Sequence, residues 1–404
     1  MKDVLAGIRV VEVAAWTFVP ISGAVLAEWG ADVIKIEAPT GGDPQRGLVS
    51  SGLVPGGNGV NFMFELPNRG KRSVGLDLTT DGGREMLYKL VETADVFVTN
   101  NLPDVRAKLG IELEQIRARN PKIIYVRGSG QGARGPEAGR GGFDGASYWA
   151  RAGLASIFTP EDADWPVNQR PAFGDVLGGL TIAGGISAAL VRRERTGEPS
   201  VIDVSLLGMG LWSLGPDVTS AKLYENVEIP AFDRDSAPNP LVGTYPTKDG
   251  RFISLILLQS DRFWPDLADH LDRPDLIDDP RFKDGMARYE NRRECIQVLR
   301  DIFRERTYAE WCDRLRTLKG VWAPVQTPLE THDDPQVAAN GYLEPITAPS
   351  GATFVVPANP VQFDETPASV GPAPGHGEHT DEVLLELGLS YDEILEHKVS
   401  GAVL

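Results

Sequence analysis

The first 130 residues alternate between strand-like and helix-like segments, and this alternation limits the possible folds more than any other feature. Residues 8–14 (IRVVEVA) are rich in Val and Ile and predict a strand. Residues 20–30 (PISGAVLAEWG) predict a helix that begins with Pro and ends with Gly. Residues 31–39 predict a second strand. The resulting β-α-β unit implies parallel strands that are joined by a right-handed crossover.

The same alternation continues through residue 130. Further strands are predicted over residues 72–78, 95–100 and 123–130, a helix over 81–94, and short helices over 103–119. Strands that alternate with helices in this way are typical of an open sheet with helices on both faces. We therefore predict an α/β fold with a doubly wound, Rossmann-like sheet domain.

The composition shifts from about residue 230. Residues 239–258 (NPLVGTYPTKDGRFISLILL) predict a hairpin, and charged helical segments follow it. We assign residues 1–220 to the first part of a large α/β domain, 221–330 to a smaller α+β domain, and 331–404 to a return to the large domain. Two domains suit 404 residues, because a single core usually stops growing at a smaller size.

Charge and composition exclude several classes of partner. The 40 basic and 57 acidic residues give a net charge of −17, which argues against nucleic acid or an anionic membrane as the main partner. The amino terminus lacks the pattern of a signal peptide, and no apolar stretch looks long enough to span a bilayer. The two cysteines and five histidines form no metal-binding motif. We expect a cytoplasmic protein without a metal site or a membrane segment.

Known nucleotide and hydrolase motifs are missing. The turn after the first strand reads AAWTFVP instead of G-x-G-x-x-G, so a dinucleotide site has no support. The chain also lacks a P-loop and a G-x-S-x-G elbow. Residues 128–145 are dense in glycine and would let the backbone approach a ligand closely. A flexible surface loop is the alternative, and the sequence does not decide between the two.

Asp175 is the residue that most strongly suggests chemistry. It precedes residues 176–191, an uncharged run in which only Thr181 and Ser187 are polar. Burying an unpaired charge is costly, so this carboxylate needs a reason. One reason is a helix N-cap. The other is a nucleophile that the positive end of the helix dipole keeps ionised. Both reasons can hold together.

Nine segments, spread over nearly the whole chain, carry a resemblance to a known family. They are GIRVVEVA, LAEWGADVIKIEAP, NRGKRSVGLDL, ADVFVTNNLPD, GSGQGARGP with GGFD, GDVLGGLTIAGGISAALVRRERTGE, IDVSLL, NPLVGTYPTKDGRF and PGHGEHTDEVLLELG. In this order they resemble the family III CoA-transferases of the CaiB/BaiF type, which include formyl-CoA and carnitine CoA-transferases. The resemblance implies an interlocked homodimer with its site between the two domains and near the partner chain.

The resemblance also implies an activity, that of a transferase of sulfur-containing groups. Asp175 would attack an acyl-CoA thioester to give a mixed anhydride, and the released CoA thiolate would convert it to an aspartyl-CoA thioester. An acceptor acid would then repeat these steps in reverse. Amides of the helix start and nearby glycines would stabilise the oxyanions. The partners would be an acyl-CoA and a free carboxylic acid, with CoA as part of the substrate and no tightly bound cofactor.

A set of residues matches the family's CoA-binding segments. They are Trp16, Thr17, Phe18, Asn68, Arg69, Lys71, Arg72, Asn100, Lys108, Gly142, Phe143 and Asp144. The resemblance implies that Lys71 and Arg72 meet the nucleotide phosphates. Lys108 stands where the family usually has Arg. Ala38 stands where some members have Arg, so we expect Arg46 or Arg69 to replace that contact.

Two alternative functions remain. The related 2-methylacyl-CoA racemases place a His before the residue that is Asp144 here, and this chain has Phe143, which cannot transfer a proton and which we expect to be a packing ring. The other alternative is a CoA-binding protein without turnover. For the acid pocket, Tyr148 and Trp149 suggest an aromatic wall, and Arg151 suggests a partner for the second carboxylate of a dicarboxylic acid.

Overall fold

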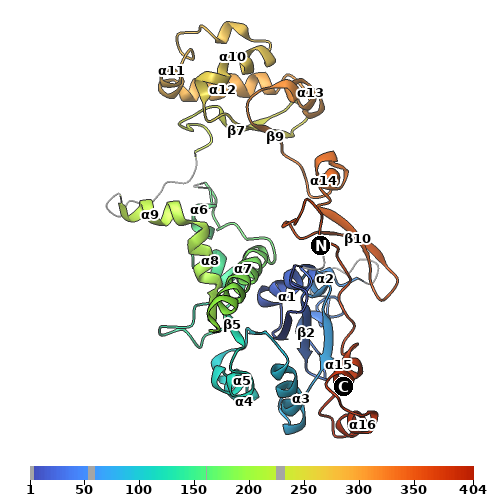
Figure 1. Cartoon of the computed structure of the whole chain (residues 1–404). Helices are drawn as coiled ribbons and strands as arrows, with labels where there is room; N and C mark the ends of the chain where they lie inside the picture. The colour runs from blue at the N-terminus through green and yellow to red at the C-terminus, as the bar shows by residue number, and fades with distance from the viewer. Residues whose placement is uncertain (1–3, 53–59, 161, 224–232) are drawn as a thin grey trace. The chain divides into compact units, whose positions relative to one another are not determined.

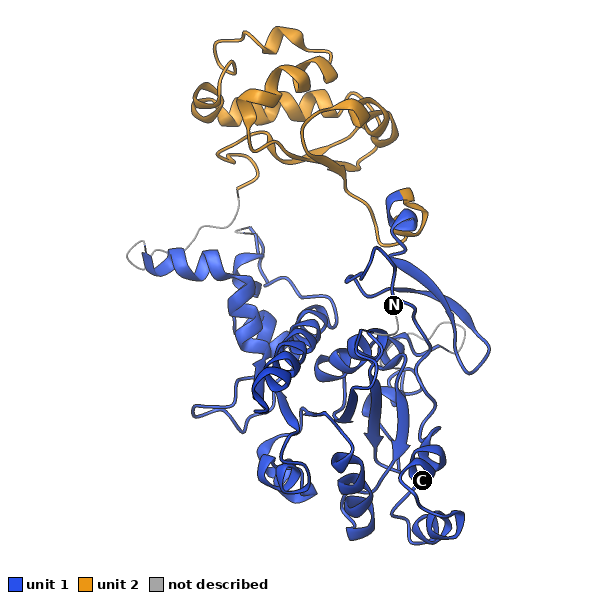
Figure 2. Cartoon of the chain, viewed as in Figure 1, with its two compact units in different colours: residues 1–229, 336–404 blue, residues 230–335 orange. Residues whose placement is uncertain are grey.

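The computed structural model describes residues 4–52, 60–160, 162–223 and 233–404. The chain forms two compact units, which Figure 2 shows in different colours. Unit 1 comprises residues 1–229 and 336–404, and unit 2 comprises residues 230–335. The chain therefore leaves unit 1 once and returns to it.

A six-stranded parallel sheet forms the centre of unit 1 (Figure 1). Its strands are β1 (Arg9–Val13), β2 (Asp32–Glu37), β3 (Arg72–Gly75), β4 (Val96–Thr99), β5 (Ile124–Ser129) and β6 (Val201–Ser205). They lie in the order β3-β2-β1-β4-β5-β6, and every neighbouring pair is parallel. The predicted doubly wound sheet is confirmed. The direction of winding reverses between β1 and β4, where open sheets of this kind bind ligands.

Helices cover both faces of this sheet. The longer ones are α1 (Phe18–Glu28), α3 (Asp81–Glu92) and α7 (Phe173–Thr196). The shorter ones are η1 (Pro44–Gly47), α2 (Phe62–Asn68), α4 (Pro103–Leu109), α5 (Leu113–Arg119), η2 (Gly145–Ala150), α6 (Leu154–Ile157), α8 (Leu206–Ser213) and α9 (Gly215–Leu223). Successive strand residues face opposite ways. Val10 therefore joins the core beneath α1 and α7, while Val11 joins the core beneath α3.

Helix α7 differs from the sequence expectation in two ways. Asp175 lies in its first turn, and the N-cap position belongs to Ala172, so the prediction that Asp175 is the N-cap is wrong. The sequence also suggested that no apolar stretch is long enough to span a bilayer, whereas α7, alone among the described helices, is long and apolar enough to cross a membrane by length and composition. However, Ile182, Ala183 and Ile186 are buried in the core that α7 shares with α1 and the sheet. These contacts make α7 a core helix of unit 1.

Unit 2 combines an antiparallel sheet with helices. The sheet contains β7 (Val242–Pro246), β8 (Phe252–Ile256) and β9 (Trp322–Pro324). The helices are α10 (Ser260–His270), η3 (Pro274–Leu276), α11 (Gly285–Glu290), α12 (Arg292–Phe303), α13 (Tyr308–Arg314), η4 (Leu315–Thr317) and η5 (Glu330–Asp333). The predicted hairpin is confirmed by the antiparallel pairing of β7 with β8.

The last segment of the chain returns to unit 1, and its carboxyl-terminal part packs on the β3 edge of the large sheet. It contains α14 (Pro335–Ala339), the hairpin of β10 (Leu343–Thr347) and β11 (Thr353–Pro357), α15 (Thr380–Glu386) and α16 (Tyr391–Val399). The amide of His379 donates to the carbonyl of Ser73 at 2.9 Å, and the amide of Leu404 donates to the carbonyl of Gly75 at 3.1 Å.

A buried cluster of charges lies beneath the turn between β1 and α1. The Lys71 ammonium donates to both oxygens of Glu12, at 2.8 and 2.7 Å, and to the carbonyl of Pro20 at 2.8 Å. The Lys35 ammonium lies 3.2 Å from Glu12 and 2.9 Å from Asp43. These four side chains are at most 1% exposed. Removing one member of such a pair leaves an unpaired charge in the interior, which strongly destabilises the fold. The cluster therefore holds the β1–α1 turn against the sheet.

We predict that Lys71→Met lowers the free energy of unfolding by about 3 kcal/mol, because it leaves Glu12 partly unpaired in the interior. Urea unfolding followed by tryptophan fluorescence measures this change. The control is Arg316→Ala, whose partner Asp313 is 76% exposed and which should leave the unfolding curve unchanged. Equal unfolding curves for Lys71→Met and the wild type would contradict the structural role.

Candidate active site

Three segments of unit 1 meet at the carboxyl edge of the sheet: the β1–α1 turn, the glycine-dense loop after β5, and the start of α7. Phe18 joins them, because its buried ring lies against both Gly128 of β5 and Gly178 of α7. A Cβ atom at Gly178 would overlap this ring, and one at Gly128 would lie 3.1 Å from it. Glycine at both positions therefore lets α7 approach the turn.

Asp175 lies half-buried in the first turn of α7. Burial, and to a smaller degree the charge of Asp144, raises the pKa of Asp175 to about 7. The expectation that the helix start keeps this carboxylate fully ionised is therefore wrong. A carboxylate with such a pKa is about half ionised at neutral pH, which suits a group that must both lose and regain its charge.

The carboxylate that caps α7 comes from a different part of the chain. The Gly174 amide donates to the two oxygens of Asp144 at 3.1 and 3.0 Å, and the Asp175 amide donates to the same carboxylate. The side chain of Ala172, at the N-cap position, cannot accept a hydrogen bond. Asp144 thus supplies the acceptor that the helix start needs.

Two aromatic rings are exposed beside this point. Trp16 and Phe143 are in edge-to-face contact, with ring centroids 5.7 Å apart. Phe143 therefore packs against another ring, as expected, but it does so at the surface, where it is 64% exposed. Trp16 has a positive φ of 67°, a strained conformation for a bulky residue, and such strain is common at ligand sites.

The glycine-dense loop is held by polar contacts, so the alternative of a merely flexible loop is not supported. The Gln131 side chain donates to Ser147 Oγ at 2.9 Å, and a Cβ atom at Gly142 would overlap that hydroxyl group. Arg151 donates to Gln131 Oε1 at 2.9 Å and forms an ion pair with Glu137. The Arg151 guanidinium, which we expected to meet a dicarboxylic acid, therefore already has an acidic partner.

The other residues expected near the acid do not form an exposed wall. Tyr148 is 1% exposed, and Trp149 stacks on Phe158 with centroids 5.6 Å apart. The expectation of a wall formed by Tyr148 and Trp149 is therefore wrong, because both rings pack within the chain. Exposed rings near the start of α7 include those of Trp16, Phe143 and Phe173.

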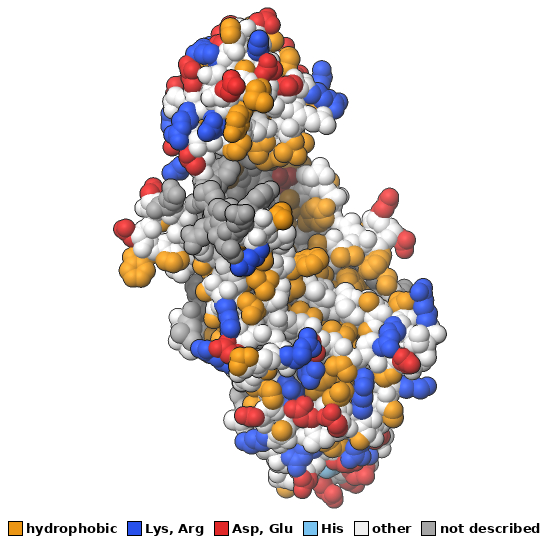
Figure 3. Space-filling view, turned by 90° about the vertical axis from the view of Figure 1, so that its left-hand side faces the viewer, with side chains coloured by type: hydrophobic (Ala, Val, Ile, Leu, Met, Phe, Trp, Pro, Cys, Tyr) orange, Lys and Arg blue, Asp and Glu red, His pale blue; other side chains and the backbone are white. Residues whose placement is uncertain are grey.

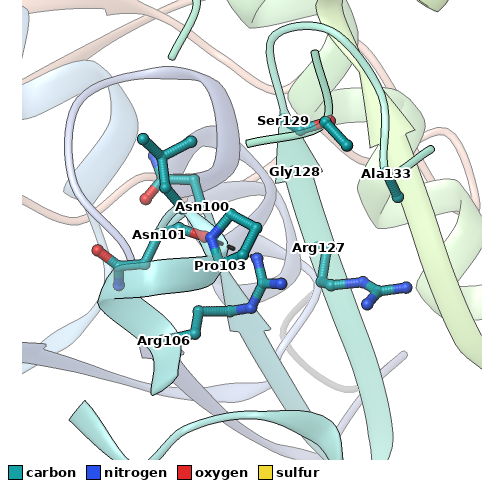
Figure 4. Close-up of a pocket in the computed structure, with 10 residues that line it drawn as sticks. Asn100, Asn101, Pro103, Arg106, Arg127, Gly128, Ser129 and Ala133 are labelled. Atoms are coloured by element: carbon teal, nitrogen blue, oxygen red, sulfur yellow. Dashed lines mark hydrogen bonds between the residues drawn. The ribbon is translucent and has the colours of Figure 1, made fainter. Parts of the chain in front are cut away.

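Asn100 bridges the two central strands where the sheet winding reverses. Its amide group donates to the carbonyl of Ala15 at 2.6 Å, and the Ala15 amide donates back to its oxygen at 3.1 Å. Next to it lies a cavity, shown in Figure 4, at the carboxyl ends of β4 and β5. Its lining residues are Asn100, Asn101, Leu102, Pro103, Arg106, Arg127, Gly128, Ser129, Ala133 and Ala138.

Two basic residues of this cavity are missing from the sequence-based set. Arg106 donates to the carbonyl of Asn101 at 2.8 Å, and Arg127 forms an ion pair with Asp203 at 2.7 Å. Arg127 belongs to β5, and Arg106 lies in α4, the helix that follows β4. Their position at the carboxyl ends of parallel strands is a signal that could have identified them.

The basic and polar residues near β3 point away from this edge or are enclosed. Lys71 is fully buried in the charge cluster, and its neighbour Asn68 accepts from it at 3.2 Å. Arg69 pairs with Glu28 at 2.6 Å, and Arg72 pairs with Asp32 at 2.7 Å. Since the Lys71 side chain has no exposed surface, its ammonium group cannot contact a phosphate in this structure.

The remaining candidate residues are distributed as follows. Thr17 is buried, and its hydroxyl oxygen accepts from Gln45 at 2.6 Å. Lys108 is exposed on α4. Arg46 pairs with Glu37 at 2.6 Å and lines a cavity of about 210 Å³. Among the described residues, no group of three or more His, Cys, Asp or Glu side chains could hold a metal ion.

Comparisons with known proteins identify the family of this chain. The chain matches the model of CoA-transferase family III over residues 5–380. It is 34% identical, over 99% of both chains, to the (R)-2-hydroxy-4-methylpentanoate CoA-transferase of Clostridioides difficile. It is 33% identical, over 96% of both chains, to the succinate–glutarate CoA-transferase of Agrobacterium fabrum. A solved CaiB/BaiF family protein from Brucella suis is similar with a TM-score of 0.82 and 27% identity, and the match covers 96% of this chain and all of that one.

The matched range includes all three segments of the site. The chain belongs to CoA-transferase family III. The resemblance seen in the sequence is confirmed, and so is the expected enzyme class, a CoA-transferase. The racemase alternative is not favoured, because these relatives are named as CoA-transferases.

We predict that Gly178→Ala lowers stability by about 2 kcal/mol and weakens CoA binding, because the new methyl group displaces Phe18 from its place against α7. Thermal unfolding and calorimetric titration with CoA measure the two effects. Gly215→Ala is the control, because a Cβ atom at Gly215 meets nothing within 4 Å. If Gly178→Ala behaved like this control, α7 would not depend on the close approach.

Proposed function

We propose that the enzyme moves CoA from an acyl-CoA to a second carboxylic acid, with Asp175 as the nucleophile. The observation that carries this proposal is the position of Asp175: a half-buried carboxylate, without a cationic partner among the described residues, where the β1–α1 turn, the glycine-dense loop and α7 meet. A carboxylate without a cationic partner is free to attack a carbonyl carbon.

The proposed reaction has two symmetrical halves. An Asp175 oxygen attacks the thioester carbonyl, the C–S bond breaks, and CoA leaves as a thiolate. The thiolate attacks the Asp175 carbonyl of the mixed anhydride, which releases the donor acid and forms an aspartyl-CoA thioester. The acceptor carboxylate then attacks this thioester, and the same steps run in reverse. The covalent intermediates keep the thioester's free energy on the enzyme.

The source of oxyanion stabilisation follows from the hydrogen bonds of α7. The amides of Gly174 and Asp175 already donate to Asp144, and the amide of Val176 donates to the carbonyl of Ala172 at 3.0 Å. These three amides are therefore engaged, and the expectation that the helix start supplies the donors has no support. We assign this role to amides of the glycine-dense loop, around Gly142.

For CoA itself, we propose a path along the carboxyl edge of the sheet. The thioester end lies by Trp16, Phe143 and Asp175, and the chain of the cofactor passes the crevice at Asn100. Ligands of doubly wound folds occupy this crevice. The exposed Lys108 offers a charge to a phosphate group. The enclosure of Lys71 argues against the phosphate contact that the family resemblance implied.

We further propose that the chain acts as an interlocked homodimer in the cytoplasm, as the resemblance implies. Support comes from the apolar surface of α7 and α8, where Leu177, Val191, Leu211 and Trp212 are between 40% and 82% exposed. Figure 3 is turned toward this side of the chain and shows hydrophobic side chains at the surface. An apolar area of this kind marks an interaction surface.

We predict that incubation with butanoyl-CoA leaves a covalent adduct, equal in mass to CoA minus one water, on the peptide that contains Asp175. Intact-mass and peptide mass spectrometry measure it, and Asp175→Asn should show none, because an amide is not a nucleophile. Exchange of the α-proton with deuterated solvent, without an adduct, would favour the racemase. CoA binding with neither result would favour the binding protein without turnover.

We predict that Trp212→Glu converts a dimer into a monomer, because it places a charge in an apolar interface. Analytical ultracentrifugation measures the sedimenting mass. The matched control is Met286→Glu in unit 2, a residue with 66% exposure, which should leave the dimer intact. A wild-type chain that sediments as a monomer would refute the dimer.

A further inference from the structure

We propose that Asp144 is a positioning residue for Asp175: its carboxylate fixes the first turn of α7 through the backbone amides there, and its negative charge acts together with burial against the ionisation of that nucleophile. This inference rests on the proposed role of Asp175 as the nucleophile. It concerns a residue that the sequence marks only as part of a CoA-binding segment.

The geometry begins with the unusual start of α7. Ala172 occupies the N-cap position with a positive φ of 62°. A helix start leaves amides without partners, and they usually find an acceptor in the N-cap side chain. Here the acceptor comes from a residue 30 positions earlier in the chain. Asp144 is 5% exposed and binds the Gly174 amide with both oxygens.

The close approach requires glycine at position 174. A Cβ atom there would overlap both the Asp144 carboxylate and the Tyr148 ring. Gln169 forms an additional hydrogen bond with the Asp144 carboxylate. The carboxylate is therefore held from two sides, and a shift of Asp144 would move the turn that carries Asp175.

The electrostatic effect follows from the same placement. Among the described residues, Asp144 is the charged group that acts on Asp175, and it acts with burial to raise the pKa of Asp175. Within the part of the chain that the structure describes, no charge of opposite sign acts on Asp175. The η2 segment contributes the Tyr148 phenol, which donates to Ser213 Oγ at 3.2 Å, and α1 contributes the ring of Phe18 beside Gly178.

This arrangement favours acyl transfer. Two carboxylates close together in a buried place repel each other, so the ionised form of Asp175 is raised in free energy. Once Asp175 has become an anhydride or a thioester, it is neutral and the repulsion ends. The charge of Asp144 therefore raises the free energy of the reactant carboxylate but not that of the neutral covalent intermediates. As a consequence, Asp175 is protonated in part of the enzyme molecules at neutral pH, and these molecules cannot attack the thioester.

The test compares Asp144→Asn with Asp144→Ala. We measure the rate of adduct formation from butanoyl-CoA as a function of pH. The wild-type rate should rise with pH through a midpoint of about 7, because only ionised Asp175 attacks. Asp144→Asn keeps an oxygen for the Gly174 amide and removes the charge, so its midpoint should fall by about 1 pH unit. Asp144→Ala also loses the cap, and its limiting rate should fall about 100-fold.

The control is Asp164→Asn, which removes a charge from an exposed acidic residue and should leave the midpoint unchanged. A purely structural role for Asp144 would lower rates without moving the midpoint. If Asp144→Asn kept the wild-type midpoint, or if Asp144→Ala kept the wild-type limiting rate, the proposal would be overturned.

A second readout separates this proposal from the proposed function. Carbodiimide reacts with protonated carboxyl groups, so labelling of Asp175 with carbodiimide and glycine ethyl ester reports its protonation without any turnover. A labelling midpoint that falls in Asp144→Asn supports the proposal even if no CoA adduct forms in the wild type. A CoA adduct in the wild type with an unmoved labelling midpoint refutes the proposal and leaves the proposed function standing.

Discussion

The contact between α1 and α7 determines the rest of the large unit. Two consecutive glycines of α7, Gly178 and Gly179, lie against Phe18 and Ile21 of α1, and a side chain at either glycine would overlap them. This contact brings the start of α7 over the carboxyl edge of the sheet, beside the turn that follows β1. Without this contact, the start of α7 would lie away from the ligand crevice, and Asp175 could not reach a substrate bound there.

Much of the architecture could be predicted from the sequence because it depends on local periodicity. The alternation of strands and helices up to β5 was sufficient to predict the doubly wound sheet, and the pattern of residues 239–258 was sufficient to predict the hairpin of the second unit. Strand β6 was identified only as a family motif, IDVSLL, although Gly197 and Pro199 between α7 and β6 are turn signals.

The site was harder to predict because it depends on contacts between distant segments. Asp175 was identified by its isolation in an apolar run. The partner that caps its helix lies 30 residues away, and no local pattern connects the two. Lys71 illustrates the opposite error: as part of a basic pair it suggested phosphate binding, whereas its ammonium compensates Glu12 in the interior. Sequence shows that a charge is present, and only the fold shows which charge faces it.

Adjacent positions in the glycine-dense loop have separate duties. Phe143 projects its ring to the surface, while Asp144, the next residue, turns its carboxylate inward to the start of α7. Because the supporting contact belongs to position 144 alone, the side chain at position 143 is free to vary without disturbing the helix that carries Asp175. A related protein could replace the Phe143 ring with a side chain that transfers protons, and so gain a new reaction while the start of α7 stays unchanged. The loop is thus a natural point for divergence of chemistry within one fold.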